Sequence, residues 1–534
     1  MSSPRAACPP AALLWLLALV GAAQRASAQA DPFAPGVRWT QAPAPGAPAL
    51  PRAAALAADD NAGLGAWSGA HPGFSAGSAH ALGSADPFAR EAAAPGATGS
   101  SGIAAGAGPW IYMLSQVPAP DAWSRRTRVE GATVDAAASA GALVPAWVRE
   151  TAFAANGPAR IAVEASGASA WFAAFDDGAR RVRVERLAGA DGAVLAARDL
   201  DAVGLQELAV AADGSRVALA AGLDLFVLDG QGATVHQAAL TATTTALSLS
   251  GDGHVLVHGV TGGLARRVQV GASYTVAPGV AAGPGELAVR AALDAAGATL
   301  AIGWWHAPTG VAWRFEVHDL VLATRVVERV FGGAPGGLQD LPTAVALTPD
   351  GRRAAFTCWS GATGAPELAI WDRASDAWVV EADLPGSAFA LALDATGTRA
   401  LVAAKSAHAN VLSATGELVL VDTGERDLQV LGPAQTGGVL HLAARQSGAT
   451  AVLFLFGDPA PAPFRVPGVA GRLHLQRAGL GVQRVLAGPD GRADLVLPLP
   501  LDPAAIGSVR HAQAAFRGPG GTTLGATLVR VRIL

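Results

Sequence analysis

One short pattern recurs along much of this chain and limits the folds open to it: an apolar strand, a tight glycine turn and a second apolar strand. Its clearest copy is Thr343–Cys358, TAVALTPDGRRAAFTC, with the turn at Pro349, Asp350 and Gly351. Proline fixes φ, aspartate can bond nearby backbone and glycine supplies a positive φ, so the turn closes an antiparallel hairpin. The alternating apolar residues on either side give each strand one buried face.

The hairpin recurs about seven times, at intervals of 39 to 54 residues, and a third apolar strand follows most copies. A period of about 40–50 residues with several strands per unit is typical of a β-propeller. The sequence therefore predicts an all-β fold, an about seven-bladed β-propeller plus a small C-terminal β-sandwich. The turn glycines of the expected blades are Gly167, Gly214, Gly253, Gly297, Gly351, Gly397 and Gly448.

In four units the third strand ends on an aspartate that precedes a polar turn, a position where the carboxylate can accept backbone N–H groups. These residues are Asp229, Asp319, Asp372 and Asp422. The segment Thr348–Phe356 resembles the strand–turn–strand core of WD40-like propeller repeats of the TolB type, and the aspartate-ended strand is similar to that of WD40 and YVTN-type units. The resemblance covers roughly residues 145–467. The resemblance implies a WD40-like propeller of a bacterial secreted type. The motif specifies a propeller blade and does not indicate an activity.

The first 28 residues resemble a secretory signal peptide. Arg5 precedes the apolar run Ala11–Ala23, which is too short to span a bilayer, and Ala26 to Ala28 offer small residues for cleavage. The alternative is an uncleaved anchor. Because no other long apolar run follows, we expect no membrane span in the mature chain. The expected location is secreted, periplasmic or at the cell surface.

Three further segments are expected after the signal peptide. Residues 29–108 are rich in Ala, Pro and Gly without a sustained period, which favours a flexible segment. Residues 109–467 should form the propeller, with repeats from about residue 159 and a closing strand at about 146–154 that completes the last blade. Residues 468–534 should form a β-sandwich of about five strands. There Gly491–Pro500 and His511–Ala514 resemble a C-terminal β-module of bacterial secreted proteins.

Composition and motifs exclude several kinds of chemistry. Charged residues make up 15% of the chain and the formal net charge is −4, without a basic run suited to nucleic acid. The GxSxG match at Gly73–Gly77 lacks the strand and helix that a nucleophile elbow requires. Cys358, the single cysteine after the signal peptide, lies on an apolar strand and is expected to be a buried small hydrophobe. No catalytic residue, metal ligand or cofactor is assigned; Asp176-Asp177-Gly178 could contribute to a calcium loop, but a solvated turn is favoured.

Long connections gather on one side of the expected ring. Loops between the second and third strands of a blade emerge on the same face as the connections between blades, and long loops on a rigid scaffold often bind ligands. The insertions are Gly303–Ala312, Phe331–Leu341, Trp359–Pro366, Lys405–Gly416 and Gly457–Pro463. They bring the candidate binding residues Trp304, Trp305, His306, Trp313 and Trp359, which suit a protein or carbohydrate surface. The alternative is that these rings pack between blades.

The function expected from these features is that of an exported, non-catalytic binding protein with its partner on the long-loop face. The alternative is a propeller enzyme of the hydrolase, lyase or lactonase type, with its site in the axial channel, because fold alone does not fix function. A third reading gives the C-terminal module a display or assembly role. The sequence leaves the oligomeric state open.

Overall fold

The computed structural model describes residues 36–41, 50–56, 63–68, 78–82, 90–93, 99–105, 110–119, 125–133, 145–332, 339–360, 365–384, 386–410, 416–424, 426–430, 436–467, 469–505 and 508–533. The signal segment 1–28 and the GxSxG match at Gly73–Gly77 lie outside them. The regular elements among the described residues are strands, apart from one short 3-10 helix, η1 (Pro503–Ala505). None of their helices has the length and apolar character needed to cross a membrane.

Eight antiparallel four-stranded sheets make up the larger part of the described chain, and we number them sheet 1 to sheet 8. In order from first to fourth strand they are β2 (Leu50–Leu56), β3 (Gly63–Ser68), β4 (Ser78–Leu82), β5 (Arg90–Ala93); β6 (Gly99–Ala105), β7 (Trp110–Pro118), β8 (Arg125–Thr133), β9 (Trp147–Glu150); β10 (Arg160–Val163), β11 (Ser169–Asp176), β12 (Arg181–Ala188), β13 (Val194–Leu200); β14 (Glu207–Val210), β15 (Arg216–Ala221), β16 (Asp224–Asp229), β17 (Thr234–Ala239); β18 (Leu247–Leu249), β19 (Val255–Val260), β20 (Gly263–Val270), β21 (Ser273–Ala281); β22 (Glu286–Leu293), β23 (Thr299–His306), β24 (Ala312–Asp319), β25 (Thr324–Gly332); β26 (Pro342–Leu347), β27 (Arg353–Cys358), β28 (Leu368–Asp372), β29 (Ala377–Ala382); and β30 (Ala388–Leu393), β31 (Arg399–Lys405), β32 (Gly416–Asp422), β1 (Gly36–Gln41).

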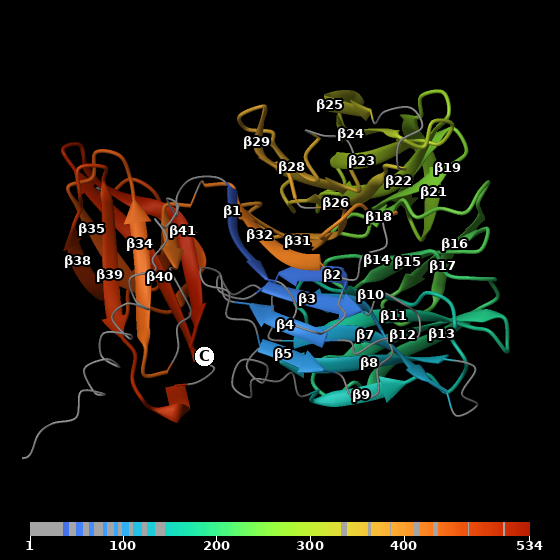
Figure 1. Ribbon diagram of the computed structural model, residues 1–534, viewed down its shortest axis with the longest axis horizontal. Coiled ribbons are helices and arrows are strands. Elements are labelled where there is room, and N and C mark those ends of the chain that lie inside the picture. The colour runs from blue at the N-terminus through green and yellow to red at the C-terminus, as the bar shows by residue number, and fades with distance from the viewer. Residues whose placement is uncertain are drawn as a thin grey trace, which may run out of the picture.

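The eight sheets stand around an axis, each packed on the next (Figure 1). Their first strands form the inner ring, in the order β2, β6, β10, β14, β18, β22, β26, β30, and β30 contacts β2 again. The apolar core lies between adjacent sheets, as where Trp171 and Val184 of sheet 3 pack with Leu219 of sheet 4. This is the propeller expected from the sequence, with eight sheets among the described residues where about seven were expected.

Six of the seven glycine turns that defined the repeat, all except Gly448, lie on one face of the ring, which we call the turn face. Gly351 has φ of 68°, and a Cβ there would lie 2.5 Å from the Thr299 hydroxyl of sheet 6. Asp350 accepts hydrogen bonds from the Thr348 hydroxyl at 2.6 Å and the Arg352 amide at 3.0 Å, which explains the residue types of this turn. Glycine is required because the turn needs a positive φ and also because the neighbouring sheet is so close.

Backbone hydrogen bonds join successive turns around this face. The amide of Ala165 donates to the carbonyl of Ala212, and the Ala212 amide donates to Gly251, each at 2.8 Å. Farther round, Ala295 donates to Pro349 at 2.9 Å. The repeated turns therefore trace an arc of the ring, as the sequence predicted.

The ring closes differently from the prediction. The expected closing strand at about 146–154 contains β9, which pairs with β8 inside sheet 2. The fourth strand of sheet 8 is instead β1, whose Gly36 pairs with Asp422 and Gln41 with Leu418 of β32. The prediction was wrong because strand pairing uses backbone groups, which β1 can supply despite its weak side-chain pattern.

The expected flexible segment at residues 29–108 also differs from the structure. Its described residues form strands β1 to β6, which contribute the outer strand of sheet 8, the whole of sheet 1 and the inner strand of sheet 2. These strands contain few β-branched residues. Their neighbours supply the burial that composition alone did not indicate: β2 contacts β30, β31 and β6.

The C-terminal module begins at β33 (Leu428–Val430), earlier than the expected residue 468. Its two facing sheets contain β33, β34 (Val439–Arg445) and β39 (Arg492–Pro498), and β38 (Gly481–Leu486), β35 (Ala451–Phe456), β40 (Val509–Gly518) and β41 (Gly521–Arg532), while β36 (Pro459–Phe464) pairs with β37 (Leu473–Leu475). Leu442, Val452, Phe454 and Phe516 lie in the core between the facing sheets. The hairpin at Gly448 therefore joins the two sheets of a sandwich and is not a seventh blade.

Candidate functional site

The face opposite the glycine turns carries the longer connections, and we call it the loop face. The chain enters each sheet from an inter-sheet connection and runs inward-to-outward through antiparallel strands, so turns between second and third strands return to that same face. By the described strands that flank them, four of the five predicted insertions begin and end on this face. The exception is Gly457–Pro463, which leads into β36 and belongs to the C-terminal module.

Two predicted contact residues on this side are parts of the core. The Trp304 side chain is 0% exposed, its indole N–H donates to Glu316 Oε2 at 2.6 Å, and the Arg314 guanidinium lies over its ring. The Trp313 ring is also buried and stacks on Phe331, with centroids 4.0 Å apart. For these two residues the packing alternative describes the structure, because a buried ring offers a partner no surface.

Trp304 covers a charged network inside sheet 6. Glu316 also binds Arg314, accepts from Arg325 at 3.0 Å and pairs with His318 at 3.0 Å. Burial opposes ionisation of Glu316, but these donors and the nearby positive charges lower its pKa to about 2. The network keeps a buried carboxylate charged and holds the sheet together, which is a structural role.

The other predicted residues remain partly exposed on the loop face. Trp305 and His306 end β23, and His306 Nδ1 lies 2.9 Å from the Thr309 hydroxyl. Trp359 follows β27, and its ring meets Phe389 edge-on at 6.2 Å. Trp305 and His306 come from sheet 6 and Trp359 from sheet 7. Their part in binding stays a prediction.

Polar side chains lie buried beneath the loops of sheets 7 and 8. His408 Nε2 lies 3.0 Å from Asp340 Oδ1, and its Nδ1 accepts the Asn410 amide at 3.2 Å. Cys358 is buried and its thiol donates to the Pro366 carbonyl at 3.4 Å; burial raises its pKa. This confirms the expectation of a buried, unreactive cysteine.

Glu367, at the base of the same loops, has an unusual protonation. Burial, with a contribution from the neighbouring Asp383, raises its pKa to about 8 although the Leu384 amide donates to it at 2.6 Å. At neutral pH the carboxyl group is therefore mostly protonated.

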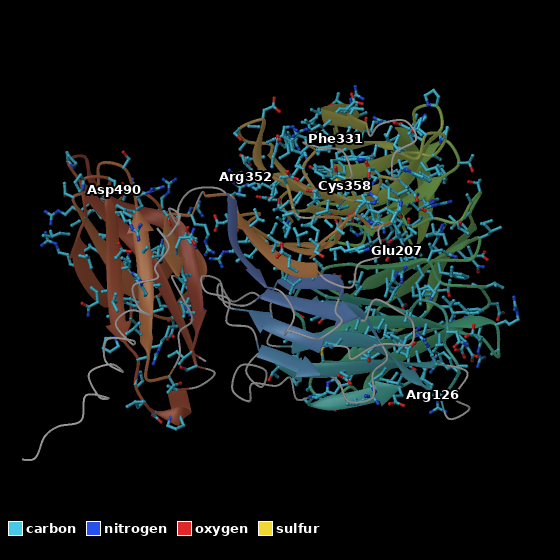
Figure 2. The ribbon with its side chains drawn as sticks, viewed as in Figure 1. Arg126, Glu207, Phe331, Arg352, Cys358 and Asp490 are labelled. Carbon is cyan, nitrogen blue, oxygen red and sulfur yellow. The ribbon has the colours of Figure 1, made fainter. Side chains whose placement is uncertain are left out.

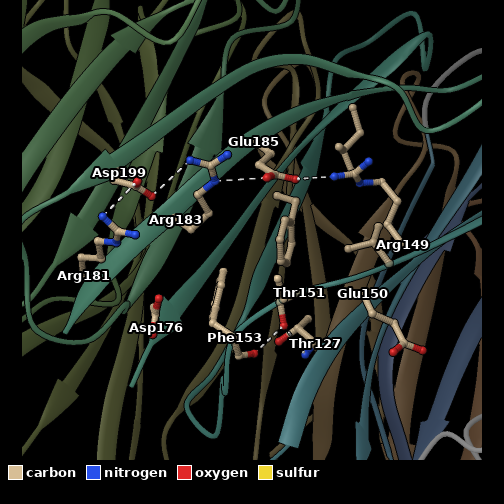
Figure 3. A pocket seen from close by; sticks show the side chains of 14 residues that line it. Thr127, Arg149, Glu150, Thr151, Phe153, Asp176, Arg181, Arg183, Glu185 and Asp199 are labelled. Carbon is tan, nitrogen blue, oxygen red and sulfur yellow. Dashed lines mark hydrogen bonds and ion pairs between the residues drawn. The ribbon is translucent and has the colours of Figure 1, made fainter. Parts of the chain in front are cut away.

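A pocket of about 250 Å³ opens on the loop face between sheets 2 and 3 (Figure 3). Its apolar part comes from Val129 of β8, Phe153 of the connection to sheet 3, Phe172 of β11 and Leu187 of β12. Thr151 shapes one wall, accepting the Thr127 amide at 3.1 Å and donating to the Phe153 carbonyl at 3.0 Å. These two bonds fix the connection that carries Phe153.

The rim of the pocket is a chain of ion pairs with alternating sign, drawn as dashed lines in Figure 3. Arg149 reaches Glu185 at 3.4 Å, Arg183 joins Glu185 at 3.1 Å to Asp199 at 3.2 Å, and Arg181 binds Asp199 at 3.2 Å. Burial acts to lower the pKa of Arg183, but its hydrogen bonds to Glu185 and Asp199 outweigh burial and raise the pKa. Since the Arg149 and Arg181 side chains are partly exposed, these pairs stabilise the fold weakly and can exchange partners with a ligand.

The sequence analysis missed this pocket, although a signal was present. Arg181, Arg183 and Glu185 alternate along one strand, which places three charged side chains on one face. Their partners come from β9 and β13, and no local pattern shows that these strands meet.

The turn at Asp176-Asp177-Gly178, considered above as a possible part of a calcium loop, borders the pocket. Asp176 Oδ1 accepts the amides of Gly178 at 3.0 Å and Ala179 at 2.9 Å, and Asp177 accepts the Asn156 amide at 2.7 Å. Both carboxylates therefore accept hydrogen bonds from backbone amides. Over the described ranges, no group of three or more His, Cys, Asp or Glu side chains is arranged to hold a metal ion.

The inner ring carries a second polar group on the loop-face side. Arg160 Nε lies 3.4 Å from Glu207, at the starts of β10 and β14, and Arg290 of β22 donates to the Thr343 carbonyl at 2.5 Å. Burial lowers the pKa of Arg290. These groups belong to the inner strands, which is where the enzyme alternative would place its site.

Comparison with solved structures supports the fold. No protein-family model matches the chain, and no curated protein matches its sequence. Among solved structures it is similar to Chaetomium thermophilum Sqt1 bound to the N-terminus of ribosomal protein L10, at TM-score 0.50 and 16% identity, over 71% of this chain and 97% of that one. It also matches the C-terminal WD40 domain of Sif2, at TM-score 0.47 and 11% identity, over 72% of this chain and 99% of that one.

The sheets, their ring and the likeness to Sqt1 define the class of this protein: it has a WD40-like β-propeller fold. To the propeller it adds a C-terminal β-sandwich, described above strand by strand.

Proposed function

We propose that this chain is an exported, non-catalytic interaction protein that holds a segment of a partner protein on the loop face of its propeller. The pocket between sheets 2 and 3 carries the proposal. Its volume of about 250 Å³ falls below the roughly 300–1,000 Å³ of small-molecule sites. It suits one large apolar side chain inserted from a longer ligand.

Apolar surface continues beside the pocket on the same face. Val203, in the connection between sheets 3 and 4, is 55% exposed, and Leu223, in the second turn of sheet 4, is 56% exposed. The two connections touch, because a Cβ on Gly222 would lie 2.9 Å from the Val203 carbonyl oxygen. An extended partner segment could therefore anchor one side chain over Phe172 and cover Val203 and Leu223.

The charges around the pocket give such a segment its orientation. Arg149 and Glu150 are partly exposed neighbours on β9 that both line the pocket, so they offer one donor group and one acceptor group to such a segment. Sqt1, which shares the fold, is bound to the N-terminus of a ribosomal protein, a fold-level analogy for capture of a protein segment.

The test is site-specific photo-crosslinking of the full chain in cells that produce it. A photoreactive residue replaces Phe153 in the pocket or Leu223 beside it, and a control places it at Leu322 on the turn face, which is 69% exposed. We expect one protein adduct shared by the two loop-face positions and absent from the control. Adducts to glycan alone would favour the carbohydrate alternative and contradict a protein partner, and identical adducts at all three positions would contradict the choice of face.

A variant pair then separates binding from folding. Arg149→Ala with Phe153→Ala should abolish the adduct formed at Leu223, while Arg198→Ala, on the exposed side of neighbouring β13, should leave it unchanged. Retention of the adduct in the pocket variant would reject the pocket as the anchor.

Export is a separate part of the proposal and rests on residues 1–28 alone. Fractionation of producing cells should place the full chain outside the cytoplasm, and removal of residues 1–28 should retain it inside. The same fractions would show whether the chain stays with the envelope or leaves the cell.

A further inference from the structure

Charge divides this chain unevenly between its two parts. Residues 428–534, the C-terminal module, contain ten arginines, four aspartates and no lysine or glutamate, a formal charge of +6. The whole chain has 38 basic and 42 acidic residues. Residues 1–427 therefore contain 28 basic and 38 acidic residues, a formal charge of −10. An asymmetry of this size between folded parts indicates an anionic partner for the basic part.

The structure places most of this excess on one side of the module. Arg484 on β38 and Arg517 on β40 belong to the same sheet, opposite Leu453 and Ala451 of the strand between them. Two strand spacings, about 10 Å, separate β38 from β40. Three more arginines lie on the segment that covers this sheet, where Leu473, Leu475 and Phe464 pack on Leu455: Arg465, Arg472 and Arg477. We call these five arginines, with Val482 and Leu486, the arginine face.

The five arginines are exposed and available. Within the described part of the chain none of them forms an ion pair, whereas Arg492 on the opposite sheet binds Asp494 at 2.9 Å. Arg477 lies over the Phe464 ring at 5.0 Å, which orients its guanidinium without neutralising it. Charges held at a surface without partners attract counterions from solution.

Apolar side chains stand between these charges. Val482 and Leu486 are two residues to either side of Arg484 on β38, so all three project from the same side of the strand. Val482 is 52% exposed and Leu486 is 74% exposed. A surface that combines cations with exposed aliphatic groups is typical of peripheral binding to anionic lipid, because the chains enter the headgroup region while the cations meet phosphate.

The arginine face is also free of the propeller. The module meets sheet 8 through β33 of its other sheet, where Gln429 accepts from Arg399 at 3.4 Å and donates to Asp422 at 3.3 Å. β38 lies on the side of the module remote from the propeller in Figure 1, and Figure 2 shows Asp490, which follows β38, on the same side.

We propose that the arginine face docks the protein on a membrane surface rich in anionic phosphate headgroups. A nucleic acid or an acidic polysaccharide would meet the same arginines but would gain nothing from Val482 and Leu486. The aliphatic pair therefore favours the lipid surface. This inference does not depend on the proposed function of the propeller.

The test is co-sedimentation of the purified mature chain with vesicles of phosphatidylcholine, with or without phosphatidylglycerol. We expect binding only to the anionic vesicles and a fall in binding with added salt. Arg484→Gln with Arg517→Gln should weaken it about tenfold to thirtyfold, given the attraction expected per arginine near such a surface. The charge-matched control Arg180→Gln with Arg198→Gln, on exposed positions of sheet 3, should bind as the unaltered chain does.

Leu486→Ser separates lipid from other polyanions. It should weaken vesicle binding at constant charge and leave retention on a heparin matrix unchanged. Equal binding to neutral vesicles, an equal loss in the control variant, or indifference of vesicle binding to Leu486→Ser would each overturn the proposal. Thermal melting of every variant confirms folding, and the lipid and salt dependence of the unaltered chain tests the proposal independently of the variants.

Discussion

The guanidinium of Arg353, in sheet 7, donates a hydrogen bond to the carbonyl oxygen of Gly397, in the glycine turn of sheet 8, across 2.9 Å. The same Nη1 reaches the Thr423 hydroxyl at 3.0 Å, and the side chain is 0% exposed. One arginine therefore joins adjacent sheets at the turn face.

Replacement of Arg353 by leucine should lower the free energy of unfolding by about 2–4 kcal/mol, because buried hydrogen-bonded groups lose their donor. Urea unfolding measures this. The control is Arg352→Leu: Arg352 is partly exposed and pairs with Asp372 at 2.7 Å, and because Asp372 keeps Arg353 at 3.5 Å, the change should cost about 1 kcal/mol or less. Equal losses in the two variants would contradict the bridging role of Arg353.

Removal of residues 1–41 should destabilise sheet 8, because β32 then loses β1 and exposes a strand edge. We expect a lower melting temperature and concentration-dependent association in light scattering. Removal of residues 1–28 alone should have neither effect. A monomer with unchanged melting after removal of residues 1–41 would show that β1 is not needed for closure.

Trp304→Ala should destabilise the chain by about 3–5 kcal/mol, since it empties a buried site and leaves Glu316 without its indole donor. Trp305→Ala, at the partly exposed neighbour, should cost much less. Chemical unfolding of the two variants side by side checks the difference. Similar costs would mean that the two rings are equally important to the core.

Glu367 should make stability fall as pH rises. Its pKa is about 8 in the folded chain against a usual value of 4.5, so between these values the folded state holds a proton that the unfolded state has released. The stabilisation is complete below about pH 4.5 and is lost as pH approaches about 8. Glu367→Gln should flatten this part of the stability profile, measured from about pH 5 to about pH 9. An unchanged slope would contradict the raised pKa.

Local chemistry made most of the fold predictable. The Pro349-Asp350-Gly351 turn and its relatives have a side-chain signature, and the ring of sheets follows from their spacing. The strand β1 has no such signature, because its place depends on backbone pairing with a strand far along the chain. At Gly448 the local signature is present but misleading. The same strand–turn–strand pattern occurs in propeller blades and in sandwiches, so the pattern assigned Gly448 to the wrong domain.

The candidate site was less predictable than the fold for the same reason. Trp304 and Trp305 are adjacent and identical in type, yet one is core and the other borders the loop face, as strand alternation requires. The pocket joins Phe153, Phe172 and Arg149 from three strands or connections. Only the packing of sheet 2 on sheet 3 brings them together.

The pairing of Gly36 with Asp422 gives the chain an unusual order of assembly. These partners stand 386 positions apart, so β1 cannot dock until the 386 positions that follow Gly36 have been synthesised. Contacts between such distant positions are slow to form. Until then the backbone N–H and C=O groups of β1 remain unpaired. A chaperone that bound β1 would therefore keep sheet 8 incomplete.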